Sequence, residues 1–431
     1  MIKLKGAHFL TAFLMGTLFP VFLGAAELPT YQKYQGPIKP GIVITSKNYQ
    51  QYLPELQKLL NPGMYNMVVQ GLERGLLTLP IEKTVEYPQP KAHEYYTQKY
   101  AGTSKIGPKG ELVGWKAGMP FPYPKNAREV GWNADRKYQA GDQLSTKNGK
   151  WLLFDRGGKL ERSLTWDYWE MKYTGRCLLS PIHEVPGNNG IIQKKFSFRI
   201  LDPFDIRGFS MIRIRYEDIK KPDDVYSYIP AIRRVRRLTG SDTADPMLGT
   251  DIIYDDFNLF YQKITPEVTF EVVEKDMLVT SHWLPDQEGG KRFAPLKGNC
   301  FQVSWQIRPV WVLTMYPNDP NYPYSKRVIV VEKQRRIPNG YAVDTYDQSG
   351  RLYRGQWFIN RIEDDLVLIG QEGKVNKAIG APPYYEGSTA GVRYDDFLSG
   401  HSTVLQNDFI ASDPFIEPKT FSFELVLKGI K

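Results

Sequence analysis

Residues 223–262, DDVYSYIPAIRRVRRLTGSDTADPMLGTDIIYDDFNLFYQ, carry the signals that decide the fold. Residues 225–230 and 232–238 are rich in β-branched and aromatic side chains and are separated at Pro230-Ala231, which predicts two short strands. A loop of Gly, Ser, Asp and Pro residues follows at 239–249, and an acidic, aromatic segment occupies 251–262.

The second of these strands carries four arginines: Arg233, Arg234, Arg236 and Arg237. Alternation along a strand sends consecutive arginines to opposite faces, and a buried face would not hold guanidinium groups without partners. The following segment offers three carboxylates: Asp251, Asp255 and Asp256. We therefore expect the arginines to anchor this segment or to meet a charged headgroup. The alternative is a solvated sheet edge with ordinary ion pairs.

The N-terminus has the pattern of a secretory signal. Lys3 and Lys5 precede an apolar run at 9–23, and small residues at 24–26 come before Glu27. We expect cleavage near Ala26 and a periplasmic protein; the alternative, a retained anchor, would need a longer apolar run. Loss of the two lysines lowers the formal net charge from +9 to +7. In an exported protein this basic excess favours anionic lipid, lipopolysaccharide or an acidic partner over nucleic acid, and it allows peripheral membrane contact.

The chain has two cysteines, Cys177 and Cys300, and no C-x-x-C redox motif. An even pair of cysteines in an oxidising compartment predicts a disulfide. Because the two positions are far apart in sequence, such a bond would act as a structural staple.

Helices are predicted in three places. Residues 46–60 and 64–77 form the first two, with a break at 61–63. The third begins after Asn126, which can cap it, and Glu129 completes a variant of the capping box. We expect this third helix to dock on a sheet; the alternative is a lid over a cavity.

Most of the remaining chain alternates in the manner of strands divided by turns. The predicted strands are 151–155, 163–172, 193–198, 209–216, 267–279, 301–315, 327–335, 341–346 and 350–363, with a last one at 420–427. Consecutive strands with almost no intervening helix predict antiparallel neighbours. We divide the mature chain into an N-terminal extended and helical region at 27–115, a sheet domain at 116–370 and a C-terminal extension at 371–431 that packs back on the sheet.

The predicted strands at 310–315 and 328–333 are substantially apolar on both faces, which predicts cover on both sides of the sheet. A curved sheet with one apolar face is suited to sheltering an acyl chain or a sterol-like ligand. The candidate cavity residues are Trp132, Phe209, Met211, Tyr228, Trp311, Leu313 and Val330. The alternative for each is an ordinary place in the core.

The sequence lacks the usual catalytic patterns. It contains no paired-histidine metal motif, no nucleophile elbow and no phosphate-binding glycine loop, so we expect no cofactor and no enzyme activity. Adjacent aspartates such as Asp255-Asp256 point to opposite faces of a strand and are typical of turns and caps. An exported hydrolase is the least favoured reading, and His183-Glu184 is where its site would be sought.

Three ordered motifs give the chain a family resemblance. They are GMPFPYPKNAREVGWN at 118–133, YSYIPAIRRVRRL with MLGTDIIYDDF between 226 and 257, and TYDQSGRLYR at 345–354, where Tyr353 stands in a position that is often Trp. In these stretches the chain resembles the domain-of-unknown-function 1329 family, which is similar to outer-membrane lipoprotein-sorting proteins.

The resemblance implies an α+β fold with a large, curved antiparallel sheet, a half-barrel with helices on its concave side. It also implies a periplasmic, non-enzymatic carrier for a lipid or other hydrophobic molecule, which serves envelope export or outer-membrane assembly. The implied partners are an RND-type exporter and an outer-membrane protein. The family offers no catalytic residues to transfer. The alternative function is an assembly factor whose sheet is filled by its own side chains and which binds protein partners.

Overall fold

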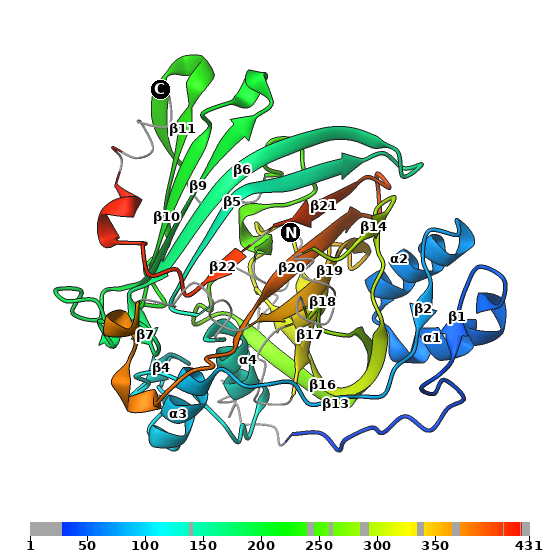
Figure 1. Cartoon of the computed structure of the whole chain (residues 1–431), viewed down its shortest axis with the longest axis horizontal. Helices are drawn as coiled ribbons and strands as arrows, with labels where there is room; N and C mark the ends of the chain where they lie inside the picture. The colour runs from blue at the N-terminus through cyan, green and yellow to red at the C-terminus, as the bar shows by residue number, and fades with distance from the viewer. Residues whose placement is uncertain are drawn as a thin grey trace, which may run out of the picture.

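The computed structural model describes residues 28–137, 141–238, 245–257, 262–284, 293–333, 340–363, 371–407, 409–422 and 424 (Figure 1). The predicted signal at 1–26 and most of the loop at 239–249 lie outside these ranges.

One antiparallel sheet of 14 strands dominates the molecule, and its order is β12-β11-β10-β9-β6-β5-β21-β20-β19-β18-β17-β16-β13, with β22 also paired to β5. The strands are β5 (Gln143–Phe154), β6 (Leu160–Lys172), β9 (Ile192–Asp202), β10 (Ser210–Tyr216), β11 (Asp224–Ile229), β12 (Arg234–Leu238), β13 (Thr269–Thr280), β16 (Trp305–Tyr316), β17 (Lys326–Glu332), β18 (Gly340–Tyr346), β19 (Leu352–Glu363), β20 (Glu386–Asp396), β21 (Ser402–Gln406) and β22 (Phe409–Ala411). β12 and β13 are its two edges, so the sheet is open. The predicted curved antiparallel sheet is confirmed.

In the residues that the structure describes, four two-stranded ribbons and four α-helices accompany this sheet. The ribbons pair β1 (Val43–Ile44) with β2 (Leu79–Pro80), β3 (Lys105–Ile106) with β4 (Leu112–Val113), β7 (Thr174–Arg176) with β8 (His183–Glu184), and β14 (Leu296–Lys297) with β15 (Cys300–Phe301). The helices are α1 (Leu53–Leu59), α2 (Pro62–Glu73), α3 (Lys91–Lys99) and α4 (Ala127–Asp135). In the part of the chain described, none of the helices has the length and hydropathy of a membrane span.

The sheet buries both of its faces. One cluster of buried side chains joins β5, β6, β9 and β10 to β16–β20 and to α4, and it therefore occupies the concave side on which the two halves of the sheet face each other. A second cluster lies on the opposite face of β16–β21 and includes α1 and α2. Successive residues on β19 show the division, because Phe358 belongs to the first cluster and Trp357 to the second.

The C-terminal part of the chain corrects the predicted organisation. β20 and β21 lie in the middle of the sheet, between β19 and β5, so the stretch from Glu386 to Ala411 is part of the sheet and not an extension packed against it. The strand predicted at 420–427 is also wrong where it is described, because Pro418–Phe421 form a turn of 3-10 helix.

The predicted disulfide is corrected as well. Cys177 and Cys300 are both buried thiols and do not form a disulfide. Cys177 packs in a cluster with Tyr96 of α3, whereas Cys300 packs under α2 and accepts a hydrogen bond from Nη1 of Arg393 at 3.2 Å. The two thiols therefore belong to separate hydrophobic clusters.

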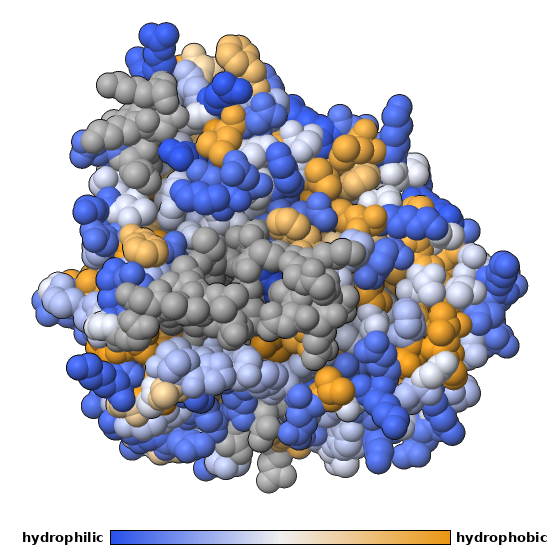
Figure 2. Space-filling model, in the orientation of Figure 1, coloured by the Kyte–Doolittle hydropathy of each residue, from blue (hydrophilic) through white to orange (hydrophobic). Residues whose placement is uncertain are grey.

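The surface is mixed. On the face drawn in Figure 2, apolar residues form small separate groups between hydrophilic ones. Such scattered apolar side chains are normal on water-facing surfaces.

Candidate functional site: the seam between the sheet edges

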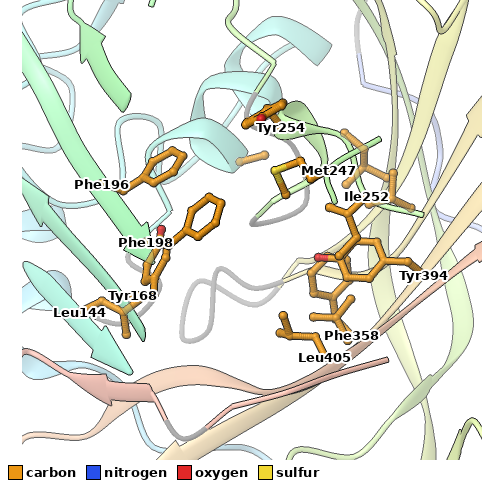
Figure 3. Packing of buried hydrophobic residues seen from close by; sticks show 14 of the residues in the cluster. Leu144, Tyr168, Phe196, Phe198, Met247, Ile252, Tyr254, Phe358, Tyr394 and Leu405 are labelled. Carbon is orange, nitrogen blue, oxygen red and sulfur yellow. The ribbon is translucent and has the colours of Figure 1, made fainter. Parts of the chain in front are cut away.

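Residues 245–257 form a segment that lies between β12 and β13 in the sequence and contributes Met247, Ile252 and Tyr254 to the cluster on the concave face. Within it, the short 3-10 helix η5 (Tyr254–Asp256) and the residues before it are buried. Figure 3 shows Met247, Ile252 and Tyr254 of this segment between Phe196 and Phe198 on one side and Tyr394 on the other. The segment therefore joins the two halves of the open sheet through apolar packing.

Two adjacent carboxylates fix η5 to both halves. Asp255 accepts hydrogen bonds from Nη2 of Arg213 on β10 at 2.8 Å and from the Tyr322 hydroxyl at 3.0 Å. Asp256 accepts one from Nη1 of Arg327 on β17 at 2.7 Å, and the Arg327 side chain has no solvent exposure. Buried ion pairs persist when each charge is also hydrogen-bonded, as here, and loss of one partner is costly.

The supporting charges belong to the same network. Asp223 bridges Arg213 and Arg215, at 2.7 and 2.8 Å. Burial opposes ionisation of Asp223, but the two guanidinium groups outweigh it and hold its pKa below the usual range.

A third carboxylate, Asp251, ties the segment to the middle of the sheet. It accepts hydrogen bonds from the Thr403 hydroxyl at 2.7 Å and lies 2.7 Å from Nδ1 of His401. Burial raises the pKa of Asp251, while Thr403 and His401 partly offset this effect.

The three predicted carboxylates pair with groups other than the four predicted arginines, and the alternative that these arginines meet a charged headgroup stays a prediction. Arg233, Arg234, Arg236 and Arg237 lie exposed on or beside the edge strand β12, and Arg237 pairs with Asp224 of the neighbouring strand. The anchoring arginines are instead Arg213 and Arg327. The alternation of side chains along a strand could have identified these two arginines. Arg213 shares a face with Met211, and Arg327 shares a face with Ile329, and both apolar residues belong to the concave cluster.

A cavity with a volume of about 440 Å³ lies in the seam. We call it the seam pocket. Its walls come from the β10–β11 side of the sheet, from residues 262–268 before β13, and from the loop between β16 and β17. Apolar and prolyl groups line it together with charged ones: Arg213, Ile219, Lys220, Lys221, Pro222, Asp223, Val225, Leu238, Asp255, Gln262, Lys263, Thr265, Val268, Pro317, Asp319, Asn321, Tyr322 and Pro323.

Lysines supply the positive side of the seam pocket. Lys220 and Lys221 are exposed, and Lys263 donates hydrogen bonds to the carbonyl oxygens of Tyr216 at 2.8 Å and Lys221 at 2.7 Å. Burial lowers the pKa of Lys263 to about 8, against the opposing effect of Asp223.

The predicted cavity residues are all buried, but they fall on different faces. Trp132, Phe209, Met211, Trp311 and Leu313 belong to the concave cluster. Val330 belongs to the cluster on the opposite face, and Tyr228 packs with Ile212 and Ile214 in a small separate group. None of the seven lines the seam pocket.

A cavity on the concave face is much smaller. The cavity between Tyr168, Phe257, Phe358 and Tyr394 measures about 20 Å³, by the same measure that gives 440 Å³ for the seam pocket. This is space for one or two waters. Room for a larger ligand is therefore found in the seam.

The residues singled out for catalysis have structural partners. Nε2 of His183 lies 3.1 Å from the Tyr100 hydroxyl, and Glu184 accepts a hydrogen bond from the amide of Asn188 at 2.9 Å. Within the described ranges, no group of three or more His, Cys, Asp or Glu side chains is arranged to hold a metal ion.

Comparisons with known proteins assign the sequence to a family. The family model described as "Protein of unknown function (DUF1329)" matches residues 43–408, a range that contains all three motifs quoted above and confirms the resemblance. The "Uncharacterized protein PA3922" of Pseudomonas aeruginosa is 23% identical over 330 residues, 73% of this chain and 68% of that protein.

Two solved structures are similar at low identity. An outer membrane lipoprotein-sorting protein domain from Vibrio parahaemolyticus is 18% identical, with 70% of this chain and 100% of that chain covered and a TM-score of 0.46. A DUF1329 family protein from Desulfovibrio piger is 15% identical, with 70% and 97% covered and a TM-score of 0.46.

Proposed function

We propose that this chain, which belongs to the DUF1329 family of proteins of unknown function, is a non-enzymatic carrier that binds a lipid or other hydrophobic small molecule in the seam pocket. The observation that supports this proposal most is the pocket's volume of about 440 Å³. Ligand pockets typically measure about 300–1,000 Å³ and are mostly apolar with a few placed polar groups.

The position of the pocket also suits a carrier. It lies where β12 and β13 have no pairing with each other, so it can widen without breaking the hydrogen bonds of a strand ladder. Burial of ligand surface against its walls would contribute on the order of 25 cal/mol per Å².

We place the carrier in the periplasm, where the predicted signal at the N-terminus would deliver it. Service in envelope export, with an RND-type exporter and an outer-membrane protein as partners, is supported by the family resemblance alone. Mass spectrometry of the mature protein tests the location, and the expected first residue is Glu27.

One observation favours a second candidate, an assembly factor that binds proteins. The buried side chains of the concave cluster leave a cavity of only about 20 Å³ between Tyr168, Phe257, Phe358 and Tyr394, which supports this alternative. The two functions make different predictions for the seam pocket, because only a carrier needs to bind a ligand there.

The decisive experiment is ligand uptake. Delipidated protein is titrated with a fluorescent fatty acid, a panel of lipids is tested as competitors, and native mass spectrometry identifies what co-purifies from the periplasm. Saturable uptake that unlabelled lipids compete away supports the carrier. A clean ligand-free mass with no uptake would leave the assembly factor.

A pair of variants tests the location. Thr265 is half-buried and lines the seam pocket, whereas Thr269 is exposed at the start of β13. Thr265→Trp should fill the pocket and reduce uptake at least about tenfold, the effect expected when a bulky side chain occupies space that the ligand needs. Thr269→Trp should leave uptake within a factor of two, and equal effects of the two changes would place the ligand elsewhere.

A further inference from the structure

A second cavity, smaller and strongly charged, lies at the C-terminal end of α4. Its volume is about 40 Å³. Because one buried water needs about 10–15 Å³, the cavity has room for roughly three waters or one small polyatomic ion. Its charged lining consists of Asp135, Arg136, Lys137, Glu170, Lys172, Lys194 and Arg215. We call it the lysine cavity.

Strand alternation explains why these charges gather. Glu170 and Lys172 continue the face of β6 that holds Tyr168, and Lys194 continues the face of β9 that holds Phe196. The concave face therefore changes from aromatic to charged toward one end of these strands.

The cationic groups outnumber the carboxylates that face them. Five cations and two carboxylates line the lysine cavity. From outside it, Glu217 pairs with Arg136 at 2.7 Å and Asp223 with Arg215 at 2.8 Å. Of the two lining carboxylates, Asp135 lies 3.3 Å from Nε of Arg136, and Glu170 lies 3.6 Å from Nζ of Lys194.

Arg136, one of the two arginines that line the cavity, is held rigidly. The Arg136 guanidinium lies 4.8 Å from the Trp115 ring and 5.5 Å from the Trp132 ring, and it donates two hydrogen bonds to Glu217. Its position is set before any ligand arrives, which lowers the cost of binding.

The lysines are crowded and poorly hydrated. Lys137 is 9% exposed, and burial together with the charge of Lys194 lowers its pKa well below the usual value. Burial lowers the pKa of Lys194 to about 8, although Glu170, 3.6 Å away, opposes the effect. Such crowding of like charges is relieved by an anion.

We propose that the lysine cavity binds a phosphate-class oxyanion. Lysines with an arginine offer charge-assisted donors from several directions, which fits a tetrahedral anion with three or four acceptor oxygens. Its source is either free phosphate or the phosphate of a lipid headgroup. The second source rests on the proposed function, because the two cavities adjoin: Arg213 lines the seam pocket, Arg215 lines the lysine cavity, and Asp223 pairs with both.

The test uses neighbours on one strand. Lys194→Gln removes a cation from the lysine cavity, and Lys195→Gln is the matched control, since Lys195 faces the other way and lies over the Tyr173 ring at 4.9 Å. Calorimetry measures the affinity for inorganic phosphate, and competition measures the affinity for a phosphate-bearing lipid and a neutral lipid with the same acyl chains. Lys194→Gln should weaken binding of the phosphate group at least about tenfold, the worth of one charge-assisted hydrogen bond, and Lys195→Gln less than twofold.

A proton readout separates the site from a general charge effect. An anion beside Lys194 raises its pKa, so binding near pH 8.5 takes up protons, which shows as a dependence of the measured heat on the buffer's ionisation enthalpy. Lys194→Gln should reduce this uptake. The midpoint of thermal unfolding of the Lys194→Gln variant should not fall below that of the wild type, because the change removes one of several crowded like charges.

The outcomes separate the sources. Phosphate binding that depends on Lys194 but not on Lys195 identifies a free-anion site, and it stands even if no lipid is taken up. A preference for the phosphate-bearing lipid alone, with the same dependence, identifies a headgroup site. If neither ligand distinguishes Lys194→Gln from the wild type, the proposal is wrong, while uptake of neutral lipid would still support the carrier.

Discussion

Asp344 is a carboxylic acid without solvent exposure, on β18 below the first turn of α2. It accepts hydrogen bonds from the side-chain amide of Asn61 and from the backbone N–H of Gly63 at 2.8 Å. A Cβ on Gly63 would lie 2.2 Å from the carboxylate, so only glycine allows this approach. Burial raises the pKa of Asp344 to about 7, and the two donors only partly oppose it.

This carboxyl predicts a pH dependence of stability. The folded state holds the proton up to about pH 7, whereas the unfolded chain releases it near pH 4, so the contribution is complete below pH 4 and is lost as the pH rises to 7. The loss amounts to at most about 4 kcal/mol at 1.36 kcal/mol per pKa unit. Asp344→Asn should flatten the slope of unfolding free energy between pH 4 and 7, as measured by urea denaturation.

The control is Asp347, in the turn that follows the same strand. Hydrogen bonds from Ser349 lower its pKa to about 2, so its titration falls below this window. Asp347→Asn should therefore leave the slope between pH 4 and 7 unchanged. A wild-type slope in Asp344→Asn would show that another group titrates.

Among the elements, α4 was the one best predicted from sequence. The Asn126 side chain accepts a hydrogen bond from the Glu129 N–H at 3.1 Å, and Glu129 accepts one from the N–H of Lys125, the residue before the cap, at 2.6 Å, which makes a variant of the capping box. The helix docks on the concave face against β13 and β16. Local sequence was sufficient here because the cap and the apolar positions lie within one short segment.

The cap gives a prediction at the same scale. Asn126→Ala should lower the free energy of unfolding by about 1 kcal/mol, because a half-buried helix start loses its acceptor. Asn126→Ser, which restores an acceptor, should recover most of it in the same denaturation experiment. Equal losses in both variants would mean that the cap bond contributes nothing.

Other features were missed because their determinants are not local. The sequence of β20, EGSTAGVRYDD, has little apolar alternation, since Arg393 and Asp395 pair with each other inside the protein. Arg213 and Arg327 find their aspartates only after folding, and the seam pocket is formed by residues from four separate segments. The antiparallel sheet was therefore predicted correctly from the sequence. The central strands β20 and β21 and the candidate site could be identified only from the structure.

At the scale of the whole molecule, β20 and β21 are what joins two half-sheets. One half consists of β5, β6 and β9–β12, and its strand β5 pairs with β21. The other half consists of β13 and β16–β19, and its strand β19 pairs with β20. No other strand of the main sheet connects the halves in the residues described. The concave cluster, which draws on both halves, depends on this junction.

A chain that ends at residue 385 should therefore lose cooperative folding. The halves would expose their concave faces to water, which predicts strong binding of a hydrophobic dye and rapid limited proteolysis. A chain that ends at residue 422 keeps both strands and should behave like the full protein. Cooperative unfolding of the shorter chain would refute the joining role of these strands.

The place of β21 in the sheet also sets an order in time. Phe154 of β5 pairs with Ser402, a residue made 402 − 154 = 248 positions later. At a synthesis rate of about 5–20 residues per second, β5 waits roughly 10 to 50 seconds for its neighbour. During that interval one flank of the growing sheet has no partner, and whatever protects it must act on the nascent chain.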